Sequence, residues 1–156
     1  MARRLITLAL VLFSTATIST ESLAQLSSGI YADKRIAINV SQAEKNQVLY
    51  EMREFLHGLH NLNNALARQD MKAFGKTARP MGPLMERLPV SLKERLPEEF
   101  TQLAIAMNEA FQNLARDAES KGDMVKTHEN LAEVMTYCSG CHDTYRFNVT
   151  PLKARK

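Results

Sequence analysis

Apolar residues recur at helical spacing over most of the chain, and beyond residue 24 no long alternation of apolar and polar residues predicts a strand. The clearest repeat lies in residues 41–68, where apolar side chains follow one another at steps of four and three: Val48, Met52, Phe55, Leu59, Leu62 and Leu66. Ser41 is a favoured N-cap residue, and Glu44 three residues later completes a capping box. This pattern predicts a long helix with one apolar face.

A shorter helix and an interrupted connection are predicted next. Asp70 can cap a helix that continues to about Ala78. The stretch 79–83 contains prolines, which remove backbone donors and restrict the residues before them, so the helix ends there. Further prolines interrupt residues 84–97, and we expect short turns or a helical piece in this connection.

Two more long helices are predicted in the C-terminal half. Pro97 suits the first turn of one helix, and Gly122 ends it. Its apolar stripe consists of Phe100, Leu103, Met107, Ala110 and Leu114. Asp123 can cap the other helix, in which steps of four and three join Met124, His128, Leu131, Met135, Cys138, His142 and Tyr145. Four helices with short connections predict an all-α fold, an antiparallel four-helix bundle over residues 41–156.

The first 24 residues have the layout of a cleavable export signal. A positively charged start precedes an apolar stretch over residues 5–13, and Ser22 and Ala24 form a small-residue cleavage site. The apolar stretch is about half of the ~20 residues that a membrane-spanning helix needs. We therefore expect a periplasmic protein with no membrane span in its mature form, beginning with an irregular arm over residues 25–40.

The charge pattern narrows the classes of partner. The formal net charge is +3, and acidic and basic residues are interspersed along the chain. Such a weak, mixed charge does not favour binding to nucleic acid or to a lipid surface. No group of residues typical of hydrolysis or group transfer is present, so we do not expect an enzyme.

The two cysteines form the motif that carries chemistry. Cys138 and Cys141, followed directly by His142, make the Cys-x-x-Cys-His signature of covalent haem attachment. Thiols at this spacing can add across the two vinyl groups on one edge of a porphyrin, and the adjacent imidazole then lies under the iron. Cys138 and His142 share a helical face, and we expect Gly140 to leave room for the ring. The motif predicts one covalent haem c, with His142 as the proximal ligand.

Three other roles for the cysteine pair are less well matched by its position. A thiol redox motif is expected near a βαβ unit at a helix start, whereas this pair lies near the end of the last helix. A zinc site needs two further ligands, which His57 and His60 could supply. A disulfide is awkward at this spacing in a helix. A metal-stabilised bundle without haem is therefore the remote alternative.

The residues around the motif resemble those of a known family. The string over residues 138–146, near the end of an exported helical chain, is similar to that of the class II cytochromes c, which include cytochrome c′ and its low-spin relatives. The resemblance covers the mature domain in architecture and the last helix in specific residues. It implies a four-helix bundle with haem on the last helix and the distal residue on the first, and it is compatible with a homodimer.

The sixth coordination position of the iron separates the candidate functions. On the predicted first helix, Met52 lies within the apolar arc, His60 lies at its margin and His57 points away. The end of an antiparallel last helix lies nearer Met52 than His60, so Met52 is the candidate distal ligand, although methionine in such a stripe is usually a core residue. His128 is about 21 Å along the helix from His142, too far to share the iron.

Two functions follow from the two states of this position. With Met52 bound, the iron is six-coordinate and suited to electron transfer, and the protein meets redox partner proteins through small transient contacts. With an open position, as in cytochrome c′, it binds NO or CO, and Met52 or Leu56 only crowds the pocket. Arg53 and Arg146 are candidates for contacts with the haem propionates, because guanidinium binds carboxylates in a bidentate manner.

Overall fold

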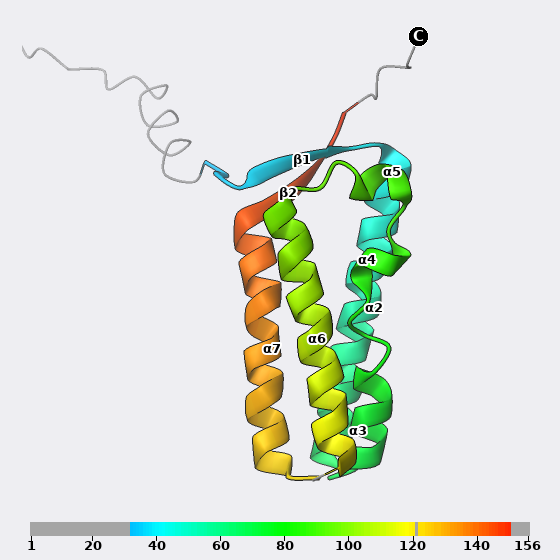
Figure 1. The fold of residues 1–156 in the computed structure, drawn as a ribbon, viewed down its shortest axis with the longest axis vertical. Coiled ribbons are helices and arrows are strands. Elements are labelled where there is room, and N and C mark those ends of the chain that lie inside the picture. Colours follow the sequence, from blue (N-terminus) through cyan, green and yellow to red (C-terminus); the bar gives the residue numbers. More distant parts are fainter. Residues whose placement is uncertain (1–31, 121, 151–156) are drawn as a thin grey trace, which may run out of the picture. The chain divides into compact units, whose positions relative to one another are not determined.

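The structure, a computed structural model, describes residues 32–120 and 122–150, so the predicted export signal lies outside the described residues. In chain order its elements are β1 (Ile36–Val40), α2 (Gln42–Ala67), α3 (Met71–Ala78), α4 (Leu84–Arg87), α5 (Val90–Lys93), α6 (Glu98–Ser120), α7 (Met124–Thr144) and β2 (Tyr145–Val149) (Figure 1). This part of the chain is mostly helical, in agreement with the predicted all-α class. None of the helices described is long and apolar enough to cross a membrane.

Helices α2, α3 and α7 begin at the predicted capping residues. The Ser41 hydroxyl accepts a hydrogen bond from the backbone N–H of Glu44 at 3.2 Å, and the Glu44 carboxylate accepts one from the N–H of Ser41 at 2.8 Å. Asp70 and Asp123 each accept a hydrogen bond from the backbone N–H three residues on, at 2.8 and 3.0 Å. These contacts satisfy donors that a helix start otherwise leaves without partners. The connection over residues 84–97 contains α4 and α5, the short helical pieces that the prolines predicted.

The core lies among α2, α3, α6 and α7. Helix α3 packs against both α2 and α6, and α6 packs against α7. The largest fully buried apolar side chains come from all four helices and from the connection: Leu62, Phe74, Leu92, Phe111, Leu114 and Leu131. In the described part of the chain, α2 and α7 are not among the closely packed helix pairs. A bundle closed around a haem between these two helices therefore stays a prediction.

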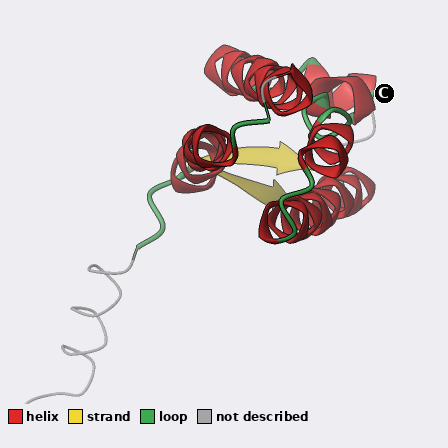
Figure 2. Cartoon of the chain, turned by 90° about the horizontal axis from the view of Figure 1, so that it is seen from below, coloured by secondary structure: helices red, strands yellow, loops and turns green. Residues whose placement is uncertain are grey.

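A two-stranded parallel sheet corrects the expectation of no strands. Residues 36–40 of the expected irregular arm form β1, which pairs with β2 so that Ile36 lies opposite Tyr145 and Val40 opposite Val149. Figure 2 shows the two strands lying side by side across the end of the helices. The sequence did not indicate this sheet because β1 has only two inward positions, Ile38 and Val40, too few to establish a period of two.

The buried face of α7 differs from the predicted one. Its buried residues are Thr127, Leu131 and Val134, whereas four members of the predicted stripe are exposed: Met124, His128, Met135 and His142. The physical reason is that α7 packs against α6 but not closely against α2, so the buried strip is turned toward α6. The exposed apolar members of the predicted stripe, Met124 and Met135, therefore face another surface.

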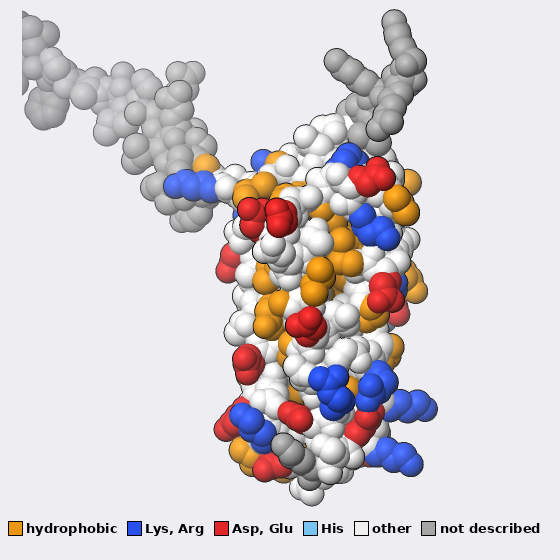
Figure 3. All heavy atoms as spheres, viewed as in Figure 1, with side chains coloured by type: hydrophobic (Ala, Val, Ile, Leu, Met, Phe, Trp, Pro, Cys, Tyr) orange, Lys and Arg blue, Asp and Glu red, His pale blue; other side chains and the backbone are white. Residues whose placement is uncertain are grey.

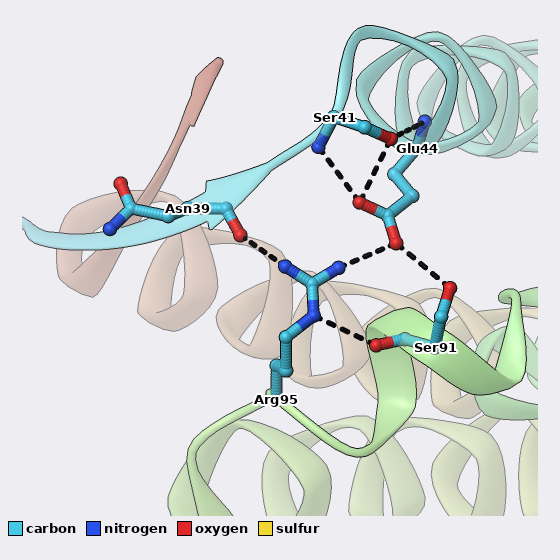
Figure 4. A network of polar contacts seen from close by, with 5 residues as sticks. All are labelled: Asn39, Ser41, Glu44, Ser91 and Arg95. Atoms are coloured by element: carbon cyan, nitrogen blue, oxygen red, sulfur yellow. Dashed lines mark hydrogen bonds and ion pairs between the residues drawn. The ribbon is translucent and has the colours of Figure 1, made fainter. Parts of the chain in front are cut away.

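A buried carboxylate fixes the junction between β1 and α2 (Figure 4). Glu44 is only 6% exposed, and its Oε1 accepts hydrogen bonds from Arg95 at 2.5 Å and from the Ser91 hydroxyl at 2.9 Å. The same guanidinium donates to the carbonyl of Asn39 in β1 at 2.8 Å. The Arg95 guanidinium, helped by hydrogen bonds from Ser41 and Ser91, lowers the pKa of Glu44 to about 2, although burial acts in the opposite direction. The network ties α2, β1 and the α5 segment together.

Candidate haem site

The motif residues occupy the last two turns of α7. Cys138 and Cys141 are half-buried free thiols, and His142 is exposed. Burial raises the pKa of both thiols, and the charge of Cys138 raises that of Cys141 further. The thiols are therefore protonated at neutral pH and are not joined to each other. This is the form of the sulfur that adds as S–H across a vinyl group.

A cavity shows which sides of α2 and α7 face each other. It has a volume of about 610 Å³ and lies between the end of α2 and the start of α7. Its walls are formed by Asn63, Leu66 and Ala67 from α2, and by Met124, Val125, His128, Glu129 and Ala132 from α7. The two helices run in opposite directions (Figure 1). These residues therefore mark the facing side of each helix.

Met52 and His142 lie on the continuation of these sides. Met52 precedes the cavity residue Leu66 by fourteen residues, and His142 follows the cavity residue His128 by the same number. Fourteen residues are close to four helical turns, about 21 Å, so each step returns nearly to the same side of its helix. Because the helices are antiparallel, both steps lead to the same level. Helical geometry thus brings Met52 and His142 to one level on facing sides.

The side chains around these two residues are apolar and open to solvent. Leu56 and Leu49 precede the cavity residue Asn63 at steps of seven and are 65% and 44% exposed, and Met135 is 45% exposed on the facing side of α7. Met52 is half-buried against the core. Exposed apolar side chains that gather at one place indicate a binding surface, because their burial is favourable. Two apolar walls beside free thiols and an exposed imidazole fit a flat, largely apolar haem.

The other histidines lie away from this level. His57 lines a separate cavity of about 440 Å³ between α2 and the segment after α3, and its Nδ1 is 3.6 Å from Glu54. His60 is exposed, with its Nε2 2.9 Å from the side-chain amide of Asn64. Within residues 32–120 and 122–150, no three His, Cys, Asp or Glu side chains are grouped to hold a metal ion. The Cys₂His₂ set of the zinc alternative is thus not assembled among these residues.

The arginines near the site include one that the sequence did not indicate. Arg146 is half-buried in β2 and donates hydrogen bonds to the carbonyl of Arg35 at 3.4 Å and to Asn148 at 2.7 Å, while Arg53 is exposed on α2. Arg35 donates a hydrogen bond to the carbonyl of His142 at 3.2 Å. Strand pairing brings Arg35 to the motif, and because that pairing was not predicted, no sequence signal pointed to this residue.

Gly140 faces α6 rather than the side of His142. A Cβ at this position would contact Leu103 of α6 at 3.8 Å, an ordinary van der Waals distance. Residues two apart in a helix lie on nearly opposite sides. The room that Gly140 leaves is therefore on the far side of α7 from His142, contrary to the expectation.

Comparison with known protein families agrees with this site. The family model described as Cytochrome C′ matches residues 92–146, which extend from α5 to the start of β2 and include the haem motif. The match supports a cytochrome c′-like class II cytochrome c, as the resemblance indicated, and hence a c-type haem protein. Members of this family are typically exported. No match to the chain was found among curated proteins or solved structures.

Proposed function

We propose that this protein is a periplasmic monohaem c-type cytochrome that transfers electrons, and that it is not an enzyme. The proposal is supported by the helical phase and antiparallel order that bring Met52 and His142 to one level, and by the exposure of the apolar side chains Leu49, Leu56 and Met135. When bound, haem iron supplies a one-electron carrier. In this proposal the haem closes the α2–α7 side of an antiparallel four-helix bundle.

Each residue of the site has a distinct part in this proposal. The thiols of Cys138 and Cys141 attach the porphyrin to α7, and the His142 imidazole supplies the proximal nitrogen. The Met52 thioether supplies the distal sulfur, a ligand that raises the potential and needs little rearrangement on reduction. The apolar side chains of Leu49, Leu56 and Met135 exclude water from the ring. Their role in covering the ring accounts for their exposure to solvent in the structure.

Binding of a diatomic gas is the second candidate. Met52 is half-buried against the core, and in that position it can remain a packing residue instead of a ligand. The iron would then be five-coordinate, with an open distal side for NO or CO. Leu56, four residues on and far more exposed, would limit the size of the gas pocket.

Visible spectra of the haem-bearing protein separate the two candidates. We expect a low-spin spectrum in both oxidation states that CO does not change. Met52→Ala should convert the spectrum to high spin and allow CO to bind, whereas His57→Ala, at an exposed position of the same helix, should leave the wild-type spectrum unchanged. A high-spin wild-type protein that binds CO would replace electron transfer by gas binding.

The expected partners follow from the carrier role. We propose that redox proteins meet the haem edge through transient contacts, which are small for electron-transfer complexes. On the face that Figure 3 shows, which has α6 in front, acidic and basic side chains are interspersed with apolar ones, in line with the mixed charge of the sequence. A homodimer is compatible with the family resemblance, and sedimentation of the haem-bearing protein tests it.

A further inference from the structure

The β1–β2 pair lies between the end of α7 and the start of α2. β2 leaves α7 at Tyr145, which is paired with Ile36, and β1 enters α2 after Val40, which is paired with Val149. Since the strands are parallel, α7 ends beside the beginning of the pair and α2 begins beside its end. Figures 1 and 2 show the strands crossing from one helix to the other.

Hydrogen bonds at both ends of the pair support this placement. At the α7 end, Arg35 donates to the carbonyl of His142 at 3.2 Å. At the α2 end, the N–H of Thr150 donates to the carbonyl of Val40 at 3.1 Å. The two helix ends are therefore separated by the length of the strands.

The length of the strands exceeds the spacing of packed helices. Four residue steps from Ile36 to Val40 correspond to about 13 Å of extended chain. Helices in direct contact lie about 8–10 Å apart. The difference is about 4 Å, close to the contact distance of about 3.5–4.0 Å between carbon atoms. The additional space thus corresponds to one atomic layer, the thickness of a flat ring.

The pair is also fixed to the rest of the protein. The ring of Phe100 in α6 packs edge-on against Tyr145 and Phe147 of β2, with centroid distances of 5.2 and 6.1 Å. In β1, Ile38 and Val40 are buried, and Asn39 is bonded to the Glu44–Arg95 network. A strand pair held at several points resists compression along its length.

We propose that the β1–β2 pair is a spacer that holds α2 and α7 apart by the thickness of one porphyrin ring, so that the cleft exists before haem is attached. The identity of the ring rests on the proposed function, whereas the spacing does not. The spacer role accounts for the exposure of Leu49, Leu56 and Met135 while α3 and α6 are closely packed.

Changing the strand length tests the spacer. Deleting residues 37–38 and 147–148 shortens each strand by two residues and preserves the alternation of inward and outward side chains. Ile36→Thr, which keeps the length at an exposed position, is the control. In the exported protein with native cysteines, we expect covalent haem, measured by in-gel peroxidase staining, to fall at least tenfold in the shortened variant and to stay unchanged in the control. Equal haem yields would overturn the spacer.

A distance measurement tests the same role without haem. We replace both native cysteines by Cys138→Ser and Cys141→Ser and attach spin labels at Glu54→Cys and Glu133→Cys. Pulsed electron paramagnetic resonance then measures the distance between α2 and α7. We expect the shortened strands to reduce this distance by about 4 Å, because the helices then reach their contact spacing of about 8–10 Å and can approach no further. An unchanged distance in a helical protein would overturn the spacer alone. Absence of covalent haem from the wild-type protein would instead overturn the proposed function.

Discussion

In the proposed haem site, the chemical character of the iron depends most on the side chain at position 52. A thioether and an imidazole both bind haem iron, but they stabilise its oxidation states differently, and methionine favours the reduced state. Met52 is half-buried, with Leu49 and Leu56 more exposed on the same side of α2. Replacement of this one side chain should therefore change the electronic properties of the iron without changing the fold.

Met52→His should keep the iron six-coordinate and low spin but lower its reduction potential. We expect a decrease on the order of 0.1 V, within the range of about 0.8 V over which axial ligands set haem potentials. Spectroelectrochemical titration of the wild type and the variant measures it. His60→Ala, which alters an exposed histidine of the same helix, is the control and should leave the potential unchanged. An unchanged potential in Met52→His would show that position 52 does not contact the iron.

The Glu44 carboxylate makes the free energy of unfolding depend on pH in the acidic range. Its pKa is about 2 in the folded protein, against 4.5 for an ordinary glutamate, so the unfolded chain binds the proton more tightly. The stabilisation is therefore complete above about pH 4.5 and is lost as the pH falls toward 2. Glu44→Gln should be less stable than the wild type at pH 6, and the difference should disappear near pH 2.

Thermal unfolding followed by far-ultraviolet circular dichroism between pH 6 and pH 2 measures this dependence. Glu133→Gln, at an exposed position of α7, is the matched control and should unfold as the wild type does at each pH. A stability difference for Glu44→Gln that stays constant down to pH 2 would contradict the role of the Glu44 carboxylate.

At the scale of elements, the close approach of α3 to α6 contrasts with the open side between α2 and α7. Gly75 allows this approach, because a Cβ there would lie 2.6 Å from Glu119 Cγ and 3.1 Å from the carbonyl oxygen of Ala115. The backbone oxygen cannot move aside as a flexible side chain does. The packing of α3 therefore depends on the absence of a side chain at position 75.

Gly75→Ala should lower the free energy of unfolding by about 1–3 kcal/mol, the usual cost of overpacking a core. Gly140→Ala is the comparison, because its Cβ has ordinary space and alanine favours a helix by up to about 1 kcal/mol. Guanidinium titration of both haem-bearing variants measures the difference. Equal stabilities would mean that α6 moves away from α3 at little cost.

Elements that depend on neighbouring residues in the chain could be predicted from the sequence. The starts of α2, α3 and α7 follow from Ser41, Asp70 and Asp123, because each side chain bonds its own helix. The strands could not be predicted, since β1 is stabilised by residues at the other end of the domain. The buried face of α7 was also wrong, because periodicity shows that a helix has an apolar side but not which neighbours cover it.

In the candidate haem site too, the features set by nearby residues could be predicted from the sequence, and those set by distant contacts could not. The spacing of the haem motif is local, and the helical phase of Met52 follows from its own helix. The role of Arg35 beside His142 was not predictable, because it depends on the strand pairing. The two-residue offset of Gly140 from His142 already places it on the far side of the helix, but its neighbour Leu103 could not be known without the position of α6.

At the scale of the whole molecule, haem attachment should stabilise one side of the helix arrangement more than the other. Helix α3 contacts both α2 and α6, whereas α2 and α7 have few contacts with each other. Stability varies within a protein according to such packing. The haem-free protein should therefore retain its strongest protection in α3 and α6.

Hydrogen exchange measured by mass spectrometry tests this expectation. In the Cys138→Ser/Cys141→Ser variant, amides in the first half of α2 and the last turns of α7 should exchange faster than in the haem-bearing protein. Amides in α3 and α6 should change least. A uniform increase over all helices would show that haem supports the whole fold instead of one side.

The pairing of β1 with β2 also determines the order in which parts of the protein can fold. The residues that pair come from the first and last elements of the described chain, so the sheet cannot form until almost all of the polypeptide has been delivered. Helices form from nearby residues and need no such wait. A growing chain that has not yet reached Tyr145 can thus have its helices and much of its core, but not the separation between α2 and α7. The cleft proposed for the haem is therefore completed last, when β2 pairs with β1.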